Sequence, residues 1–305
     1  MLSRIVRVLS IVPNQNNMAT FSRRRGKTEE VSGKTEENEK VIKSASKSSQ
    51  KRKHVVITYD SETEEPNDAE DAKIAKWEPK HWREVVDNIR EMRKKKDAPV
   101  DEMGCDQCHD KDAPPEVQRY QSLISLMLSS QTKDQITFAA MQKLREHGLS
   151  IDKIMETKES KIGELIYPVS YWKVTKAKHI KLTTALLKDK FEGDIPKSVK
   201  ELCSLPGVGP KMAHLCMKSA WNIVSGIGVD THVHRISNRL KWVKKPTKKP
   251  EDTRVALESW LPRDLWDEVN HLLVGFGQQT CLPVKPLCGS CLNKSLCPFG
   301  RSVKA

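Results

Sequence analysis

A glycine-rich turn is followed directly by a lysine in the stretch Leu205-Pro-Gly-Val-Gly-Pro-Lys211. Gly207 and Gly209 permit positive φ angles, so the turn of Gly207, Val208 and Gly209 can present backbone N–H groups with little obstruction by side chains. Such donors beside a helix N-terminus form an anion site that suits a phosphate group. The alternative is a tight turn that only joins two core helices. These residues therefore form a candidate phosphate-binding hairpin.

Lys211 stands near the predicted start of the helix that follows this turn. The positive end of a helix dipole disfavours an ammonium group and favours a neutral amine, which is a nucleophile. Most lysines in such places only contact phosphate, and that is the alternative role. We treat Lys211 as a candidate nucleophile.

A candidate partner carboxylate, Asp230, lies in Gly228-Val-Asp-Thr-His-Val-His234, just before an apolar pattern with helical spacing. Taken alone, Asp230 is explained equally well as an N-cap that accepts backbone N–H bonds. Across a cleft from the Lys211 amine, it would instead handle protons and stabilise positive charge during a reaction. The pair suggests nucleophilic catalysis assisted by a carboxylate.

Four cysteines lie close together near the C-terminus, with the spacing Cys281-x6-Cys288-x2-Cys291-x5-Cys297. No secretory signal precedes them, so they favour ligation of one metal centre inside the cell over disulfide bonds. Zinc accepts four cysteines, and so does an iron–sulfur cluster. The chemistry of the thiols alone leaves both metals open.

The elements that must position these groups are predicted to be helices. Apolar residues recur at helical spacing nearly everywhere from Trp77 onward, and no alternating pattern of a sheet competes with them. One predicted helix is capped by Asp134 and runs to Gly148, and another covers residues 175–191. We therefore expect an all-α fold.

The composition is that of a basic protein with a folded body. The chain has 305 residues, of which 37% are hydrophobic, and its formal net charge is +13. Most of that charge lies outside residues 1–75, and a basic body favours a polyanionic partner, either a nucleic acid or an acidic membrane surface. No run approaches the roughly 18 apolar residues that a membrane span needs, so we expect a soluble protein.

The N-terminal part, residues 1–75, alternates Lys, Glu, Ser and Thr with few aromatic residues, and we expect it to be a disordered tail. Its first 28 residues contain no Asp or Glu, and two arginines lie opposite an apolar face on a helical wheel. This composition is typical of a mitochondrial transit peptide, although an ordinary basic tail is the alternative. The short cluster Lys51-Arg52-Lys53 favours the nucleus. We expect both compartments.

Three motifs together extend these observations: Leu205–Lys211, the stretch Val229–Arg239, and the 6-2-5 spacing of the cysteines. With Leu126–Asp134 and Ile166–Val169, they resemble the endonuclease III family of helix-hairpin-helix DNA glycosylases, in particular its eukaryotic members. The resemblance covers the chain from about residue 77 to residue 299.

The resemblance implies two helical domains with a DNA-binding cleft between them, and it places Lys211 and Asp230 on opposite sides of that cleft. One domain is a six-helix barrel that contains the helix-hairpin-helix, and the other holds a [4Fe-4S] cluster on Cys281, Cys288, Cys291 and Cys297. Beside the tail of residues 1–75, which the composition indicates, we expect the barrel at 113–225 and the cluster domain at 76–112 plus 226–305.

The activity implied by the resemblance is removal of oxidised pyrimidines from duplex DNA in base excision repair. The damaged base is flipped out, Lys211 attacks C1′ of its sugar, and the base leaves. The resulting Schiff base undergoes β-elimination, which nicks the strand at an abasic site. We expect a monomer that requires no membrane.

Gln131 matches the residue that fills the gap left by the flipped base in this family. A second wedge is implied near Tyr171 and Trp172, but the loop carries one residue more than the family pattern, so neither is assigned.

Two other functions fit parts of the sequence. A monofunctional mismatch adenine glycosylase resembles the same architecture and cysteine spacing, but Lys211 argues against it, because such an enzyme needs an activated water at that position. A non-catalytic DNA-binding module with a zinc staple would use Lys211 for phosphate contact and Asp230 only as a cap.

Overall fold

The structure is a computed structural model that describes residues 77–169 and 173–303. All of these residues belong to one unit, which spans residues 59–305. The predicted disordered tail with its targeting signals, and the candidate wedge residues Tyr171 and Trp172, lie outside the described residues.

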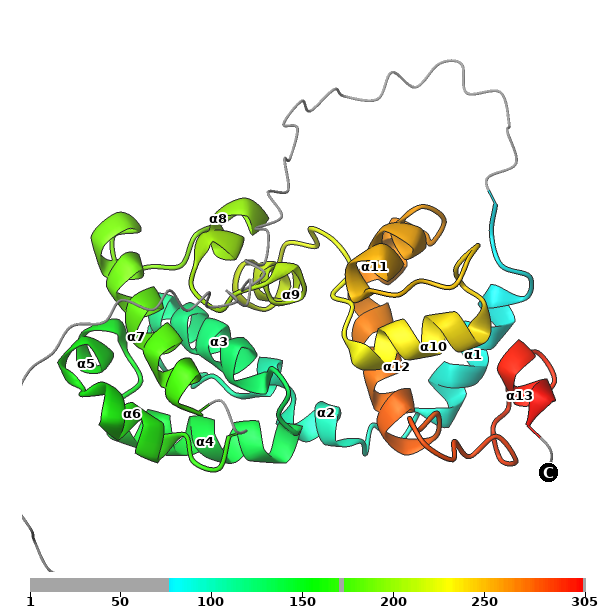
Figure 1. Ribbon diagram of the computed structural model, residues 1–305, viewed down its shortest axis with the longest axis horizontal. Coiled ribbons are helices and arrows are strands. Elements are labelled where there is room, and N and C mark those ends of the chain that lie inside the picture. Colours follow the sequence, from blue (N-terminus) through cyan, green and yellow to red (C-terminus); the bar gives the residue numbers. More distant parts are fainter. Residues whose placement is uncertain (1–76, 170–172, 304–305) are drawn as a thin grey trace, which may run out of the picture. The chain divides into compact units, whose positions relative to one another are not determined.

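Within the described ranges every regular element is a helix, which confirms the predicted all-α fold (Figure 1). In chain order the elements are α1 (Trp82–Met92), α2 (Pro99–Met103), the 3₁₀ turn η1 (Cys105–Gln107), α3 (Pro115–Ser129), α4 (Asp134–His147), α5 (Ile151–Glu156), α6 (Glu159–Leu165), α7 (Lys173–Lys190), α8 (Val199–Ser204), α9 (Pro210–Trp221), α10 (Thr231–Leu240), α11 (Pro250–Glu258), the 3₁₀ turn η2 (Arg263–Leu265), α12 (Trp266–Gln279) and α13 (Pro298–Ser302). None of the described helices is long and apolar enough to cross a membrane.

The first core is built around α3, which packs against α9, α4 and α7 (Figure 1). Every residue from Tyr120 to Leu128 is buried, so α3 has no solvent-facing side in this stretch. Each large aliphatic side chain buried there contributes about 1.5–3 kcal/mol to folding. This central helix leads at its C-terminal end directly into the loop that carries Gln131.

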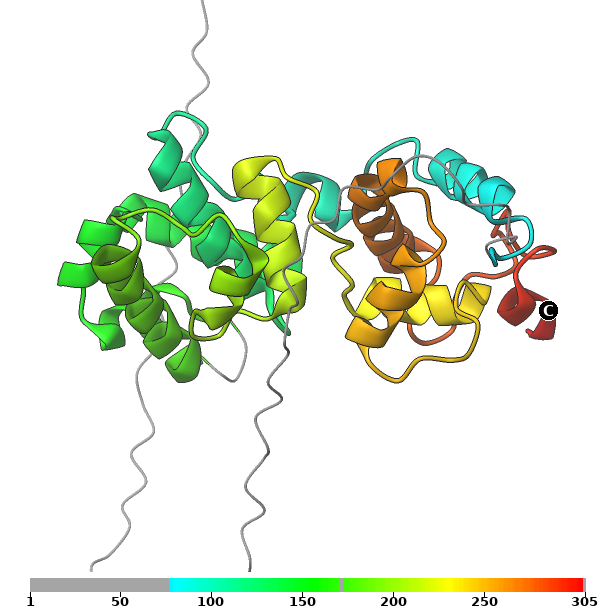
Figure 2. The same cartoon turned by 90° about the horizontal axis from the view of Figure 1, so that it is seen from above.

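The second core is formed by α1, α10, α11 and α12. Trp260 is its aromatic centre: Trp82 and Trp242 meet its ring edge-on, with ring centroids 5.4 and 5.8 Å away. In both views the cyan α1 lies beside the red C-terminal segment (Figures 1 and 2), where Asn293 donates its side-chain N–H to the Val85 carbonyl oxygen over 3.1 Å. The C-terminal loop is thus anchored to the start of the folded region.

The chain passes between the two cores twice. Val100 packs on the second core and Cys105 on the first, while Trp221 packs on the first and Ile227 is buried in the second. The first passage therefore precedes residue 112, where the sequence interpretation placed a boundary, and the second surrounds the other expected boundary at residue 225.

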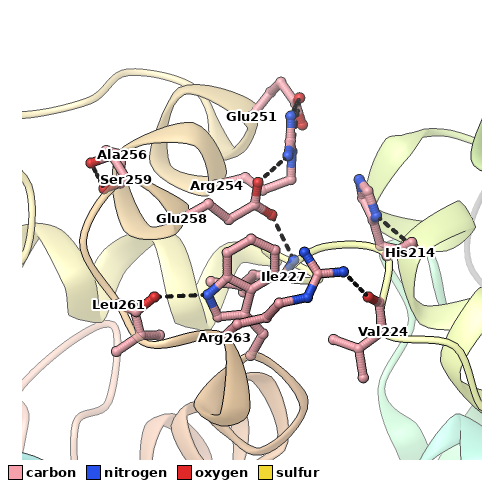
Figure 3. A network of polar contacts seen from close by, with 12 residues as sticks. His214, Val224, Ile227, Glu251, Arg254, Ala256, Glu258, Ser259, Leu261 and Arg263 are labelled. Atoms are coloured by element: carbon pink, nitrogen blue, oxygen red, sulfur yellow. Dashed lines mark hydrogen bonds and ion pairs between the residues drawn. The ribbon is translucent and has the colours of Figure 1, made fainter. Parts of the chain in front are cut away.

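A polar network holds the second passage (Figure 3). The carboxylate of Glu258 accepts the N–H of Ile227 at 2.7 Å and pairs with Arg254 at 2.5 Å. The side chain of Arg263 donates to the Val224 carbonyl oxygen over 3.3 Å. Both contacts bind the backbone of the passage to the α11–η2 region of the second core.

The other side of this passage meets the first core. His214 on α9 contacts the Ser225 hydroxyl through Nδ1 at 3.0 Å (Figure 3). A Cβ atom at Gly226 would lie 2.6 Å from the His214 ring and 2.9 Å from Glu258, so only glycine fits at this close approach. The passage leads straight into the segment that ends at Asp230.

Candidate active site

The predicted hairpin joins α8 to α9. Helix α9 begins at Pro210, and at this first helical position the missing N–H of proline costs no hydrogen bond. Gly207 has the positive φ expected from the sequence, +82°, and a Cβ there would lie 2.6 Å from Nδ1 of His179. Gly209 has φ −113°, so the positive φ that the sequence allows is used at Gly207 alone. A side chain at position 207 would therefore clash with α7, whereas a Cβ atom at Gly209 would meet no atom within 4 Å.

Val208 differs from its two glycine neighbours. Its side chain is buried in the first core, and its N–H donates to the Leu205 carbonyl oxygen over 3.1 Å. The valine therefore anchors the turn from the inside. Gly207 is exposed and Gly209 is half-buried, so these two members of the predicted trio are the ones that solvent reaches.

Lys211 is the second residue of α9 and is half-buried. The charge of Lys211 acts on two other partly buried groups. Burial raises the pKa of the Asp134 carboxyl, with the Gln278 hydrogen bond and the Lys211 charge opposing the shift. Burial likewise raises the pKa of the Cys105 thiol, again opposed by Lys211. Lys211 thus lies near two partly buried groups whose charged forms are disfavoured by poor solvation.

Asp230 is the N-cap of α10, where Oδ1 accepts the Val233 N–H at 2.8 Å. The capping role raised as an alternative is therefore confirmed, and it involves one oxygen of the carboxylate. The charge of Asp230 acts on Asp134, whose pKa it helps to raise. Capping holds this carboxylate in place at the end of the second passage, so capping and catalysis are compatible.

Asp134 is a member of the site that sequence reasoning missed. It was predicted to cap α4, but Lys133 occupies the cap position and Asp134 is the first residue of the helix. Its Oδ2 atom instead accepts a hydrogen bond of 2.7 Å from Gln278, which lies on α12 of the second core. The partners are 144 residues apart, so no local pattern could reveal the contact.

The charges of Lys211 and Asp230 both act on Asp134, so the structure brings one amine and two carboxylates into a common electrostatic neighbourhood. His232 belongs to it as well. Burial lowers the pKa of this imidazole, and Asp230 and Asp134 oppose that shift. An amine with two nearby carboxylates can exchange protons without a metal ion.

The Gln131 loop lies between α3 and α4. Gln131 is exposed and has a left-handed backbone with φ 54°. It lines a pocket together with Lys176, His179 and Gly207. The predicted gap-filling residue and the hairpin therefore border the same hollow.

The four C-terminal cysteines, Cys281, Cys288, Cys291 and Cys297, line one pocket, together with the apolar residues Leu240, Phe276 and Leu287. Burial raises the pKa of the Cys291 and Cys297 thiols, so a metal that binds them must displace their protons. Over the described ranges no three His, Cys, Asp or Glu side chains are arranged to hold a single metal ion. The thiols surround a shared space and do not converge on one point.

Two arginines of α10 hold the start of the cysteine loop. Arg235 donates to the Cys281 carbonyl oxygen over 3.0 Å. Arg239 donates to the Leu282 carbonyl oxygen over 2.7 Å and to the Cys281 thiol over 3.2 Å, and its guanidinium stacks on the ring of Phe299 at 4.5 Å. The helix that Asp230 caps therefore also fixes the loop of cysteines.

Comparison with known proteins gives the family. A family model for the "HhH-GPD superfamily base excision DNA repair protein" matches residues 124–263. "Endonuclease III-like protein 1" of Gallus gallus is 58% identical over 262 residues, covering 86% of this chain and 91% of the relative. The Mus musculus protein of the same name is 61% identical over 240 residues, covering 79% and 80%. The chain belongs to the endonuclease III family of base excision repair DNA glycosylases.

Solved structures of endonuclease III share the fold. A "non-covalent Endonuclease III-DNA Complex" matches with a TM-score of 0.61 and 27% identity, covering 72% of this chain and 94% of that one. A "Trapped Endonuclease III-DNA Covalent Intermediate" matches with a TM-score of 0.62 and 26% identity, covering 72% and 95%. The resemblance that the sequence motifs suggested is therefore confirmed for the family and its helical fold.

Proposed function

We propose that this member of the endonuclease III family is a bifunctional DNA glycosylase and abasic-site lyase that removes oxidised pyrimidines from duplex DNA. The observation that carries the proposal is the amine of Lys211 at the start of α9, next to the hairpin and in the electrostatic range of the Asp134 carboxyl. A monofunctional enzyme needs no amine there. The trapped covalent intermediate that endonuclease III forms with DNA supports an enzyme nucleophile in this family.

The proposed reaction begins with the neutral amine of Lys211, which attacks C1′ of the damaged nucleotide. The new C–N bond forms while the bond from C1′ to the base breaks, and the electron pair leaves with the base, which takes up a proton from solvent. One proton then passes from the nitrogen to the ring oxygen as the C1′–O4′ bond breaks. The nitrogen keeps its other hydrogen, and the open sugar is held as a protonated Schiff base. Loss of a proton from C2′ then expels the 3′ phosphate, which breaks the strand.

The two carboxylates have separate tasks in this proposal. Asp230, held by its cap contact, stabilises the positive charge that develops on the sugar. Asp134, whose pKa is raised by burial, is suited to accept a proton from the Lys211 nitrogen and return it. Gln278 fixes the orientation of Asp134 through the 2.7 Å hydrogen bond.

Duplex DNA with a damaged base or an abasic site is the proposed partner. The net charge of +13 supports binding of a polyanion, and Gly207 and Gly209 offer a phosphate site at the helix N-terminus. Gln131 is proposed to fill the gap left by the flipped base. One site serves one lesion, so we propose a monomer.

A [4Fe-4S] cluster is the proposed resident cofactor, bound by the four C-terminal cysteines. Their thiols share one pocket with an apolar wall, which suits a group larger than a single ion. When bound, the cluster would supply a structural staple for the loop that Arg235 and Arg239 hold. Iron and acid-labile sulfide analysis of the purified protein separates this cluster from zinc.

We further propose that the protein works in the nucleus and the mitochondrion, on the basis of the basic N-terminal composition. The test is a fusion of residues 1–60 to a fluorescent protein, compared with a fusion in which the arginines of the first 28 residues are replaced by glutamine. Loss of mitochondrial signal in the second fusion is the expected result.

The decisive experiment is borohydride trapping on a duplex with one oxidised pyrimidine. The wild type should form a covalent adduct, and Lys211→Gln should form none. Lys218→Gln is the matched control, because Lys218 lies on the same helix and pairs with Asp267 at 2.6 Å. Base release by the wild type without an adduct would indicate a monofunctional glycosylase, and binding without base release would indicate a DNA-binding module.

A further inference from the structure

Lys176 is a buried lysine of α7 that the proposed reaction does not use. Its side chain is 9% exposed, and its Nζ atom donates to the carbonyl oxygens of Leu128 and Ser130, both at 2.6 Å, and to the Thr132 hydroxyl at 3.1 Å. The three N–H groups of the ammonium thus match three acceptors in the last turn of α3 and the segment that follows it. All three acceptors lie within residues 128–132, the segment that contains Gln131.

This contact is a helix cap made by a side chain from another helix. The last carbonyl oxygens of a helix have no partner inside it, and they carry the negative end of the helix dipole, so a lysine satisfies both requirements. The segment is cross-linked further, because the Thr132 hydroxyl donates to the Ser130 carbonyl oxygen at 3.2 Å. Gln131, with its left-handed backbone, stands in the middle of these bonds.

The charge of Lys176 is costly to bury, since burial lowers its pKa to about 8 and its partners are neutral oxygens. A polar, uncharged residue of the loop itself could cap the helix without the free-energy cost of burying a charge. A buried cation whose three hydrogen bonds all go to the end of α3 and to the Gln131 loop points to a role in placing that loop.

The same helix also touches the hairpin. His179, three residues after Lys176 and so on the same side of α7, lies against Gly207. Lys176, His179, Gln131 and Gly207 line one pocket. The face of α7 therefore fixes both surfaces that are proposed to meet DNA, the Gln131 loop through Lys176 and the hairpin through His179.

We infer that Lys176 is a positioning residue that holds the Gln131 loop in the conformation needed to fill the gap in lesion-containing DNA. The inference rests on the proposed function for the part that concerns DNA. It identifies a residue that determines how strongly a duplex with a missing base is preferred over an intact duplex.

The chain supplies a matched control on the same helix. Lys181 donates to the carbonyl oxygens of Ile154 and Met155 at 2.8 and 2.5 Å, so it caps α5 in the same way that Lys176 caps α3. The loop after α5 is no part of the proposed site. Lys176→Met and Lys181→Met therefore remove the same kind of contact, one at the Gln131 loop and one elsewhere.

The test is a double-mutant cycle on the affinity for a duplex with a tetrahydrofuran abasic analogue, measured against an intact duplex. Lys176→Met should reduce the preference for the abasic duplex about tenfold, the loss expected when one hydrogen-bonding side chain is misplaced. In the Gln131→Ala background the same change should have almost no effect. Lys181→Met should leave the preference unchanged in both backgrounds. An equal loss from Lys176→Met with and without Gln131 would overturn the inference.

A second readout needs no DNA. Amide hydrogen exchange in the free protein should rise over residues 128–133 in Lys176→Met, and over residues 153–158 in Lys181→Met. Unchanged exchange over 128–133 contradicts the anchoring role. If the wild type shows no preference for the abasic duplex while exchange changes as expected, the proposed function fails and the anchoring stands.

Discussion

The Lys211 hairpin is packed into the first core, whereas the cysteine loop surrounds a pocket and is held by its own backbone turns and by two arginines of α10. In the hairpin, Val208 donates its N–H to the Leu205 carbonyl oxygen and Gly207 fits directly against α7. In the cysteine loop, Arg235 and Arg239 hold carbonyl oxygens near Cys281. The hairpin is therefore held by contacts within the protein, while the four thiols of the loop face a shared pocket. We expect the loop to depend more strongly on a bound group than the hairpin does. Substitutions near the hairpin should mainly change the reaction rate, and substitutions in the cysteine loop should mainly change stability.

The largest expected effect concerns the carboxylate of Asp230. Asparagine caps helices as well as aspartate does, so Asp230→Asn should keep α10 intact but lose the charge. We expect base release to slow by about 10³-fold, within the range that general acid–base groups contribute, with an unchanged melting temperature. Single-turnover kinetics and thermal unfolding measure the two quantities.

Asp230→Ala is the matched variant, since it loses both the cap and the charge. It should be as slow as Asp230→Asn and should also be less stable by about 1 kcal/mol. Near-normal base release by Asp230→Asn would show that the residue is only a cap. The assignment of Asp230 to the chemistry of the site would then be wrong.

The second prediction concerns the cysteine loop. Cys291→Ala should lose the proposed cluster and lower the melting temperature by about 5–10 °C, the shift that a loss of a few kcal/mol produces in a domain of this size. Cys203→Ala, a cysteine of the first core, is the control and should retain the metal. Iron analysis and thermal unfolding provide the measurement. A variant without metal but with a normal melting temperature contradicts the role of a staple.

Asp134 joins the two cores through Gln278, and it should show a trade-off between rate and stability. Its folded pKa is raised by burial above the ordinary 3.8, so stability falls as pH rises from the ordinary value through the folded one. Asp134→Asn removes this cost and keeps an oxygen for Gln278. We expect a higher melting temperature at neutral pH and a base-release rate about tenfold lower. A lower melting temperature would show that the charge supports the fold.

Local patterns predicted much of this molecule, and contacts between distant segments account for what they missed. The hairpin and the cap at Asp230 follow from glycine spacing and from an acidic residue before an apolar helix, both readable within a few residues. The pairing of Asp134 with Gln278 and the anchoring of the Gln131 loop by Lys176 join residues 144 and more than 40 positions apart. A lysine within a helical pattern gives no sign that it is buried, since most lysines are exposed.

The smallest expected effect tests whether the second passage couples the two cores. Burial lowers the pKa of His214 below its ordinary 6.5, with the charge of Arg254 adding to the shift. The unfolded chain therefore takes up a proton at a higher pH than the folded protein does, and stability is lost as pH falls below 6.5 toward the folded value. His214→Gln cannot titrate and can still meet the Ser225 hydroxyl. Its melting temperature should vary less between pH 7 and pH 5 than that of the wild type. An equal change of melting temperature in the two proteins would mean that His214 takes up its proton at no cost to global stability. The second passage would then open locally before either core unfolds.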